Sequence, residues 1–209
     1  MEKIKNRGRF IVLEGIDGAG KTTQAELLIE KLVADGRRVM RTAEPTSLPS
    51  GKEIRRALAG EIKKSECEMA LSFTLDRIIH NIHKTEGINA ALEQGYDVIC
   101  DRYYYSNLAY QGQSTDYAWV KAMNLQCPEI RKPDICIYLD LTPEQSLNRI
   151  RRGRESVEIY ENEETLTRVR NAFFSVFDDL KDTDRIEVVN AYRPSEEIAD
   201  EIYALVNSL

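Results

Sequence analysis

A glycine-rich segment near the N-terminus constrains this chain most strongly. Residues 15–22 read GIDGAGKT and match the pattern GxxxxGK[ST]. The apolar run Phe10–Leu13 precedes the segment, and Thr22–Ala34, with apolar residues at helical spacing, follows it. In such a strand–loop–helix unit the glycines let backbone N–H groups wrap phosphates, and the helix N-terminus adds positive potential. The motif therefore predicts a nucleotide-phosphate loop after a β-strand.

Short apolar runs along the rest of the chain alternate with amphipathic stretches. The predicted strands are Phe10–Leu13, Arg38–Thr42, Asp97–Cys100, Ile135–Leu139 and Ile186–Val189. The alternation predicts an α/β fold, a doubly wound five-stranded parallel sheet flanked by helices.

Helix boundary signals support this pattern. We expect Gly36 to end the first helix, the pair Thr142-Pro143 to open a helix towards Arg152, and Ser195 to open the last helix. The 209 residues contain no repeat and no Pro/Gly-rich linker, so we expect a single domain over residues 1–209.

The charge balance limits the class of partner. The chain has 35 Asp and Glu against 29 Lys and Arg, a net charge of −6, which argues against a nucleic-acid or membrane-surface binder. No run of 18 apolar residues and no signal-peptide stretch occurs, so we expect a cytoplasmic protein. The four cysteines lack metal spacing, and His80 and His83 have no third ligand candidate nearby, so we interpret both histidines as surface or packing residues.

The phosphate loop implies particular roles for its residues. Lys21 should bridge the β- and γ-phosphates of ATP, and the Thr22 hydroxyl should ligate Mg²⁺. Asp101 and Arg102 follow the third predicted strand, which suits a carboxylate that contacts Mg²⁺ through the ion's water molecules beside a guanidinium that grips phosphate. The residues expected to bind ATP are Gly15, Ile16, Asp17, Gly18, Ala19, Gly20, Lys21, Thr22 and Thr23.

Other classes of nucleotide-binding protein fit less well. A GTPase switch would need a DxxG after a later strand and an NKxD, and neither occurs. A motor or helicase would normally be larger and would carry a hydrolytic carboxylate next to the aspartate at the end of the third strand. These observations favour a kinase with a small acceptor.

Several segments, in this order and spacing, resemble the thymidylate kinase family over nearly the whole chain. They are FIVLEGIDGAGKTTQ at 10–24, Glu44-Pro45-Thr46, FTLDR at 73–77, DRYYYSNLAYQG at 101–112 and Arg152-Gly153. The resemblance implies transfer of a phosphoryl group from ATP to dTMP with Mg²⁺, a short lid at approximately 149–161, and a homodimer with the helices around Phe73 at its interface.

The resemblance also implies which residues hold the acceptor. Asp17 would face the 3′-hydroxyl of the sugar and the reacting phosphates, while Phe73 would stack on thymine and Arg77 would bond its O4 edge. Arg55 and Arg102 would hold the 5′-phosphate, and Arg56 is the alternative to Arg55. Tyr110 would exclude a 2′-hydroxyl. The remaining members of this predicted acceptor set are Glu44, Pro45, Ser106, Asn107, Gln111 and Tyr160.

The predicted lid departs from the pattern of the family. Some members carry an arginine in the phosphate loop, where this chain has Gly18, and members without it usually place a basic residue in the lid. Arg152 matches the residue that stacks on adenine, which leaves Arg154, or else Arg151, to meet the transferring phosphoryl group. Arg149 is a further basic candidate, and Glu161 is a candidate for the water shell of Mg²⁺.

Two alternatives remain open from the sequence. One is another nucleoside or nucleoside monophosphate kinase of the same fold. The other is a non-catalytic nucleotide-binding regulator, which the presence of Lys21, Thr22, Asp17 and the pair Asp101-Arg102 disfavours.

Overall fold

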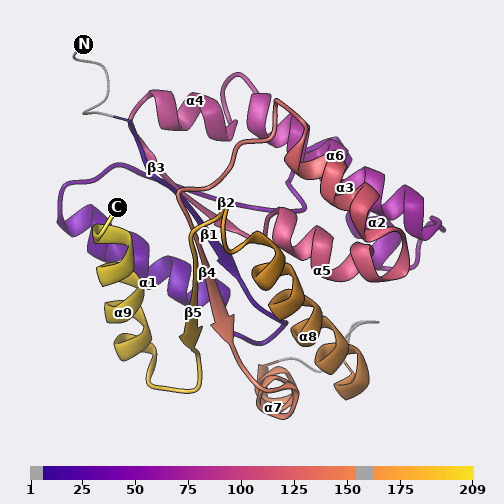
Figure 1. The fold of residues 1–209 in the computed structure, drawn as a ribbon. Coiled ribbons are helices and arrows are strands. Elements are labelled where there is room, and N and C mark those ends of the chain that lie inside the picture. The colour runs from indigo at the N-terminus through magenta and orange to yellow at the C-terminus, as the bar shows by residue number, and fades with distance from the viewer. Residues whose placement is uncertain (1–6, 154–161) are drawn as a thin grey trace.

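A five-stranded parallel sheet forms the centre of the molecule (Figure 1). The computed structural model describes residues 7–153 and 162–209. The strand order is β2-β3-β1-β4-β5, and every neighbouring pair is parallel. The strands are β1 (Phe10–Glu14), β2 (Val39–Ala43), β3 (Asp97–Asp101), β4 (Ile135–Asp140) and β5 (Ile186–Asn190). The predicted doubly wound sheet is confirmed, and each strand ends one residue later than predicted.

Helices cover both faces of the sheet. On one face lie α1 (Lys21–Ala34) and α9 (Ser195–Asn207). The other face carries α3 (Glu66–Ile82), α4 (Ile88–Glu93), α5 (Tyr104–Ser114), α6 (Tyr117–Leu125) and α8 (Glu163–Leu180). The remaining helices are α2 (Pro49–Leu58), which packs on α3, and α7 (Pro143–Gly153). No helix in the described ranges is long and apolar enough to cross a membrane, and the cytoplasmic location stays a prediction.

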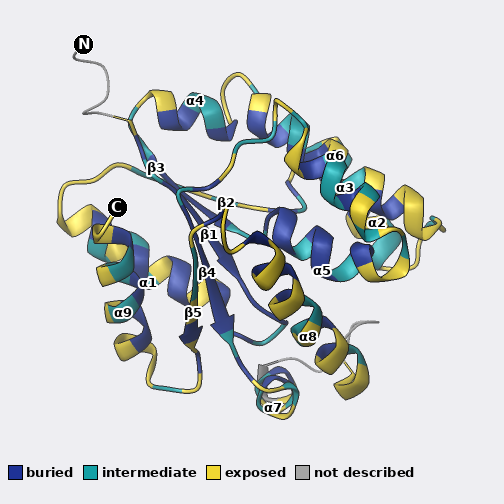
Figure 2. Ribbon diagram, viewed as in Figure 1, coloured by how far each residue is buried: buried dark blue, intermediate teal, exposed yellow. Residues whose placement is uncertain are grey.

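The central strand β1 divides the core into two layers. Its side chains alternate, so Phe10 and Val12 pack towards α5 and α8, whereas Ile11 and Leu13 pack towards α1 and α9. All five of its residues are buried, while both edge strands, β2 and β5, are partly exposed. Figure 2 shows the same arrangement, with buried residues on the sheet and exposed residues on the outer faces of the helices. The residues that follow β1 therefore leave the sheet at its most enclosed point.

The helix boundary signals act as the sequence predicts. Gly36 has a φ of 77° directly after the α1 C-cap, a left-handed conformation that suits glycine. Thr142 accepts a hydrogen bond from the backbone N–H of Gln145, and α7 begins at Pro143. The last helix, α9, begins at Ser195, as predicted. A capping box that was not predicted joins Ser65 and Glu68 at the start of α3.

A buried carboxylate, that of Asp97, lies at the amino ends of the strands. Asp97 opens β3 and is fully buried, with an oxygen 2.6 Å from Arg9 Nη2 and another 2.6 Å from Arg37 Nη2. It also accepts a hydrogen bond from the backbone N–H of Arg9 at 2.8 Å. Burial alone would raise the pKa of Asp97, but the hydrogen bonds from Arg37 and Arg9 outweigh it and leave the pKa lowered.

Asp97→Asn should lower the free energy of unfolding at pH 7 by about 3 kcal/mol, because it removes the negatively charged partner of Arg9 and Arg37. Since the folded pKa is lowered, the contribution of Asp97 is fully present above the unfolded-state pKa of about 3.9 and is lost as pH falls through the folded pKa. Urea unfolding at pH 7 and pH 3 measures both effects. Asp178→Asn, in an exposed pair with Lys181, is the control, and equal losses for the two variants at pH 7 would contradict this assignment.

Candidate active site

The phosphate loop fills the short gap between β1 and α1. Residues 15–20 connect Glu14, which ends β1, to Lys21, which begins α1. Gly15 has a φ of 152°, and a Cβ there would lie 2.9 Å from the carbonyl oxygen of Leu139. Gly18 has a φ of 75°, and a Cβ there would lie 3.0 Å from the carbonyl oxygen of Ser146. The loop is therefore tightly packed against β4 and α7, and an arginine at position 18 would be strained in this conformation.

The Lys21 side chain folds over the loop. Its Nζ donates hydrogen bonds to the carbonyl oxygens of Gly15 at 3.0 Å and Ile16 at 3.3 Å. Burial lowers the pKa of Lys21, and the positive charge of Arg102 lowers it further. A buried cation held by carbonyl oxygens can exchange these neutral partners for phosphate oxygens, which bind it more strongly.

The register of the sheet places Arg102 beside this loop. Leu13 in β1 pairs with Asp101 in β3, and the Arg102 backbone N–H donates to the Leu13 carbonyl at 2.9 Å. Arg102 has a φ of 67°, which is uncommon for a residue with a side chain and turns the chain sharply out of β3. Its guanidinium donates to Asp17 at 2.5 Å and to Ser106 at 3.1 Å.

Glu14 is a structural residue of the site that sequence reasoning missed. Its carboxylate is fully buried and accepts hydrogen bonds from the backbone N–H of Tyr103 at 2.9 Å and from the hydroxyl of Ser106 at 2.7 Å. Burial raises the pKa of Glu14, although Arg102 and these hydrogen bonds oppose the shift. The signal was available, since a carboxylate at the end of a buried central strand needs partners.

One cavity of about 570 Å³ lies between the ends of β1 and β3 and helices α2, α3 and α5. It brings together every predicted acceptor residue within the described ranges. These are Asp17, Glu44, Pro45, Arg55, Phe73, Arg77, Arg102, Ser106, Asn107, Tyr110 and Gln111. Leu58, Ala59 and Tyr103 also line it and were not predicted. A wider open groove of about 860 Å³ along α5, α6 and α8 contains none of the predicted site residues.

Arg55 and its neighbour Arg56 point to different surroundings. Arg55 lines the cavity, and its guanidinium donates to the carbonyl oxygens of Thr46 and Pro45. Arg56 is exposed and pairs with Glu61 at 3.1 Å. Of the two residues left open by the sequence, Arg55 is the one that lines this cavity.

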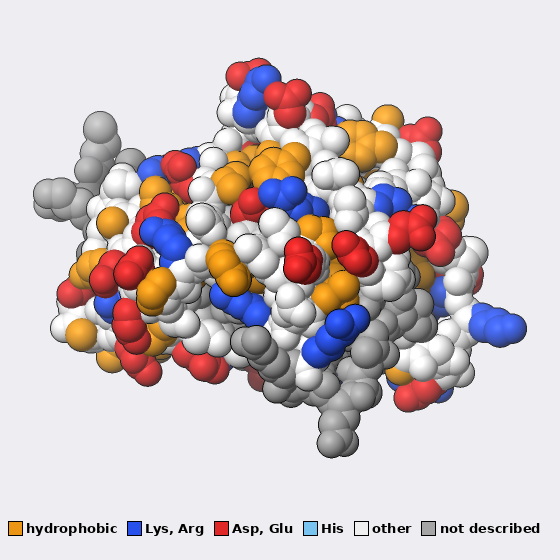
Figure 3. Space-filling model, turned by 90° about the horizontal axis from the view of Figure 1, so that it is seen from below, with side chains coloured by type: hydrophobic (Ala, Val, Ile, Leu, Met, Phe, Trp, Pro, Cys, Tyr) orange, Lys and Arg blue, Asp and Glu red, His pale blue; other side chains and the backbone are white. Residues whose placement is uncertain are grey.

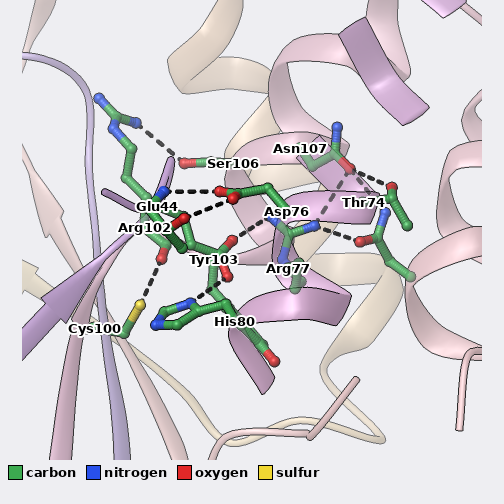
Figure 4. Close-up of polar contacts among 12 residues, drawn as sticks. Glu44, Thr74, Asp76, Arg77, His80, Cys100, Arg102, Tyr103, Ser106 and Asn107 are labelled. Atoms are coloured by element: carbon green, nitrogen blue, oxygen red, sulfur yellow. Dashed lines mark hydrogen bonds and ion pairs between the residues drawn. The ribbon is translucent and has the colours of Figure 1, made fainter. Parts of the chain in front are cut away.

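Arg77 belongs to a buried polar network, part of which Figure 4 shows. Its Nη2 lies 2.6 Å from Glu44 Oε2, and both side chains are nearly inaccessible. His80 Nδ1 lies 3.0 Å from Glu44 Oε1, and Thr42 Oγ1 lies 2.7 Å from His80 Nε2. His80 is therefore a packing residue of the buried network that holds Arg77, a connection to the site that sequence reasoning missed.

A second cavity, of about 670 Å³, lies along the phosphate loop. The predicted residues that line it are Asp17, Gly18, Ala19, Gly20, Lys21, Thr22, Thr23, Glu44, Asp101, Arg102 and Arg149. Gly15 and Ile16 do not line it, because both are buried and Ile16 packs in the core. Asp17, Glu44 and Arg102 line both cavities. The two spaces therefore meet at the Asp17–Arg102 ion pair.

The basic candidates of α7 take different positions. Arg149 lines the second cavity and donates to the carbonyl oxygens of Ala19 at 3.4 Å and Ala191 at 2.8 Å, whereas Arg151 is exposed. The side chain of Arg152 and the residues Arg154, Tyr160 and Glu161 lie outside the described part of the chain. Figure 3 looks onto the side towards which the strands point, and Lys and Arg side chains are visible near the middle of that face.

The sequence of this chain is similar to those of known proteins. A sequence profile of the thymidylate kinase family matches residues 13–202. The chain is 41% identical to a probable thymidylate kinase of Pyrococcus horikoshii, over 96% of each chain. It is 38% identical to the thymidylate kinase of Thermomicrobium roseum, over 96% of this chain and 95% of the relative.

Lys21→Ala should leave a folded protein, because the side chain contacts loop carbonyls and not the apolar core. Turnover should fall by roughly 10²–10³-fold, the scale for the loss of one preorganised charge-stabilising donor. A coupled ADP-release assay with ATP and dTMP measures this, and Lys84→Ala at an exposed lysine is the control. Near-normal turnover of a folded Lys21→Ala protein would remove this lysine from the mechanism.

Proposed function

This chain belongs to the thymidylate kinase family, whose members transfer the γ-phosphoryl group of ATP to dTMP, and we propose that the two cavities are its donor and acceptor sites. The observation that carries the proposal is their meeting at Asp17 and Arg102. ATP bound along the phosphate loop would present its γ-phosphate at this point. A nucleoside monophosphate in the other cavity would present its own phosphate there.

The acceptor cavity has groups for each part of dTMP. Phe73 offers a ring for stacking on the base, and Arg77 lies four residues further along α3, on the same face. Arg55 and Arg102 would hold the 5′-phosphate, for which planar guanidinium groups are well suited. Asp17 would face the 3′-hydroxyl, and Tyr110 would occupy the space that a 2′-hydroxyl needs.

The transfer step needs positioning more than acid–base chemistry. An oxygen of the dTMP phosphate attacks the γ-phosphorus of ATP, the bond to the β-phosphate oxygen breaks, and ADP leaves. Because the attacking oxygen is already anionic near neutral pH, no general base is required. Lys21 and Arg102 would stabilise the negative charge on the transferring phosphoryl group, and Arg154 of the lid would contribute a third positive charge there.

The cavity along the phosphate loop also suits a magnesium ion carried by the phosphates of ATP. Thr22 and Asp101 both line it and provide oxygen atoms, the donors that Mg²⁺ prefers. No cluster of three or more His, Cys, Asp or Glu in the described ranges could hold a metal by itself. This fits an ion that keeps several waters and takes few protein ligands. When bound, Mg²⁺ would neutralise charge on the phosphates, with Glu161 as a further candidate near its water shell.

We propose that residues 1–209 act as one catalytic domain with a lid at approximately 149–161. Arg152 in this lid would stack on adenine, and Tyr160 would reach the acceptor sugar. Lid closure would exclude water, which otherwise hydrolyses ATP without transfer.

The proposed acceptor site predicts a substrate order. With ATP as donor, dTMP should be the preferred acceptor among the common nucleoside and deoxynucleoside monophosphates, and ribo-TMP should be poorer because of Tyr110. Burial raises the pKa of Tyr110 to about 12, so its hydroxyl stays protonated near neutral pH. Tyr110→Phe should keep most of the sugar discrimination, and Tyr110→Ala should lose it, because the bulk of the ring excludes the 2′-hydroxyl.

Steady-state kcat/KM values for each acceptor measure this order. Equal sugar discrimination in wild type and Tyr110→Ala would show that another residue fills the 2′ position. A different best acceptor would support another nucleoside monophosphate kinase of the same fold. ATP binding without turnover of any acceptor would support a non-catalytic regulator.

We also propose that two copies of the chain associate through α3. Leu71, Leu75 and Ile82 lie at spacings of four and seven residues along this helix and are 49%, 54% and 46% exposed. Large apolar side chains repeated along one helical face indicate a protein interface. The opposite face of α3 carries Arg77, so association would also hold the base-binding helix in place.

Leu71→Glu/Leu75→Glu should shift the protein from dimer to monomer, because two charges would be buried unpaired at the interface. Sedimentation equilibrium measures the association. Val33→Glu, at a 55% exposed apolar residue of α1 on another part of the surface, should leave it unchanged. A wild-type protein that sediments as a monomer would overturn the dimer.

A further inference from the structure

We propose that Asp76, a buried residue of α3, orients Arg55 and thereby fixes the end of the acceptor cavity that holds the phosphate. Asp76 is 1% exposed and is not among the residues that line this cavity. It acts through Thr46, which lies between β2 and α2, and through Ser50 in the first turn of α2. The inference rests on the proposed acceptor site and adds a positioning residue to it.

The Asp76 carboxylate is held by neutral donors. Its Oδ2 accepts a hydrogen bond from the backbone N–H of Thr46 at 2.7 Å. Its Oδ1 accepts from the hydroxyls of Thr46 and Ser50, both at 2.6 Å. A buried carboxylate is costly unless hydrogen bonds satisfy it. Thr46 and Ser50 therefore cannot move away from α3 without a large loss of stability.

The turn that contains Thr46 is also packed against α2. A Cβ at Gly51 would lie 2.0 Å from the carbonyl oxygen of Thr46, so the backbone of the turn lies directly on the helix. The Thr46 hydroxyl accepts a hydrogen bond from the backbone N–H of Leu48, the residue before α2, at 3.2 Å. Through this turn, Asp76 connects α3 to the start of α2.

Arg55 takes its orientation from the same turn. Its Nη1 donates to the carbonyl oxygen of Thr46, and its Nη2 donates to that of Pro45. The Pro45 carbonyl and the Thr46 N–H belong to one trans peptide group, in which they point in opposite directions. Because Asp76 binds the N–H on one side, the carbonyl is directed to Arg55 on the other.

The guanidinium of Arg55 can hold these carbonyls and a ligand at once. It has five N–H groups, so two bonds to backbone oxygens leave donors for a phosphate. Arg55 and Pro45 both line the acceptor cavity. A cation oriented in advance binds an anion with less loss of side-chain entropy than a free one.

The same helix serves both ends of the acceptor cavity. Phe73 and Arg77, the residues proposed to bind the base, lie on α3, and Asp76 lies one residue before Arg77 (Figure 4). Arg77 is held by its ion pair with Glu44, whereas Asp76 holds the turn that orients Arg55. α3 therefore sets the distance between the base site and the phosphate site.

Asp76→Ala tests this role because it removes all three hydrogen bonds to Thr46 and Ser50. The KM for dTMP should rise by about tenfold or more, while the KM for ATP stays unchanged. Asp76→Asn should keep the KM for dTMP within about threefold of wild type. Its amide oxygen can accept from the Thr46 N–H, and its NH₂ group can donate to the two hydroxyl oxygens.

The route through Arg55 is tested by combining the variants. Arg55→Ala alone should raise the KM for dTMP by about tenfold. In that background, Asp76→Ala should raise the KM by no more than about a further twofold, because the group that it orients is already absent. Thermal unfolding should show the loss of stability caused by Asp76→Ala in both backgrounds.

Asp97→Ala is the matched control. Asp97 is also a fully buried carboxylate, but it lines neither cavity. Its removal should lower the thermal unfolding temperature and leave the KM for dTMP and for ATP unchanged. If Asp76→Ala does not fold, Thr46→Val decides, since it removes one bond to Asp76 and should raise the KM for dTMP by about threefold.

An unchanged KM for dTMP in folded Asp76→Ala would overturn the inference. So would an undiminished effect of Asp76→Ala in the Arg55→Ala background, or an equal rise of the KM in Asp97→Ala. If Arg55→Ala leaves the KM for dTMP unchanged, or if the wild-type protein does not phosphorylate dTMP, the proposed acceptor site itself fails. The same set of assays therefore distinguishes the two failures.

Discussion

The buried carboxylate of Glu14 is the contact on which the site depends. It lies at the end of the central strand and accepts hydrogen bonds from the first residues after the Asp101-Arg102 pair. A buried carboxylate is costly unless it is fully hydrogen-bonded, so the turn after β3 cannot move away from β1 without a large loss. The phosphate loop, Arg102 and the start of α5 are thereby held as one unit. The two cavities meet at Asp17 and Arg102 because these segments are fixed to each other.

Basic side chains are concentrated at the two cavities, although the chain as a whole is acidic. Arg102 lies where the two cavities meet, Lys21 lines the cavity along the phosphate loop, and Arg55 and Arg77 line the other cavity. Each of these cations contacts a carbonyl oxygen or a carboxylate of the protein itself. Such contacts keep the cations oriented, and phosphate oxygens can replace the weaker ones. A site built in this way can bind two anionic substrates within a protein of net charge −6.

Much of this arrangement could be predicted from the sequence. The strands and the phosphate loop carry strong local signals, since buried parallel strands appear as apolar runs and the loop needs glycine at fixed positions. The residues Phe73, Arg77 and Asn107 came from family resemblance, because no local pattern shows that α3 and α5 face one cavity. Glu14 and His80 were missed as parts of the site. Their roles depend on contacts between residues 36 and 89 positions apart in the sequence, which only the folded chain shows.

A crystal structure of the protein with dTMP and a non-hydrolysable ATP analogue tests the central claim most directly. We expect thymine beside Phe73 and Arg77, the 5′-phosphate at Arg55 and Arg102, and the γ-phosphate of the analogue at Lys21. The two phosphates should approach each other beside Asp17. Density for dTMP outside the cavity between α2, α3 and α5, or for the analogue away from residues 15–22, would contradict the account.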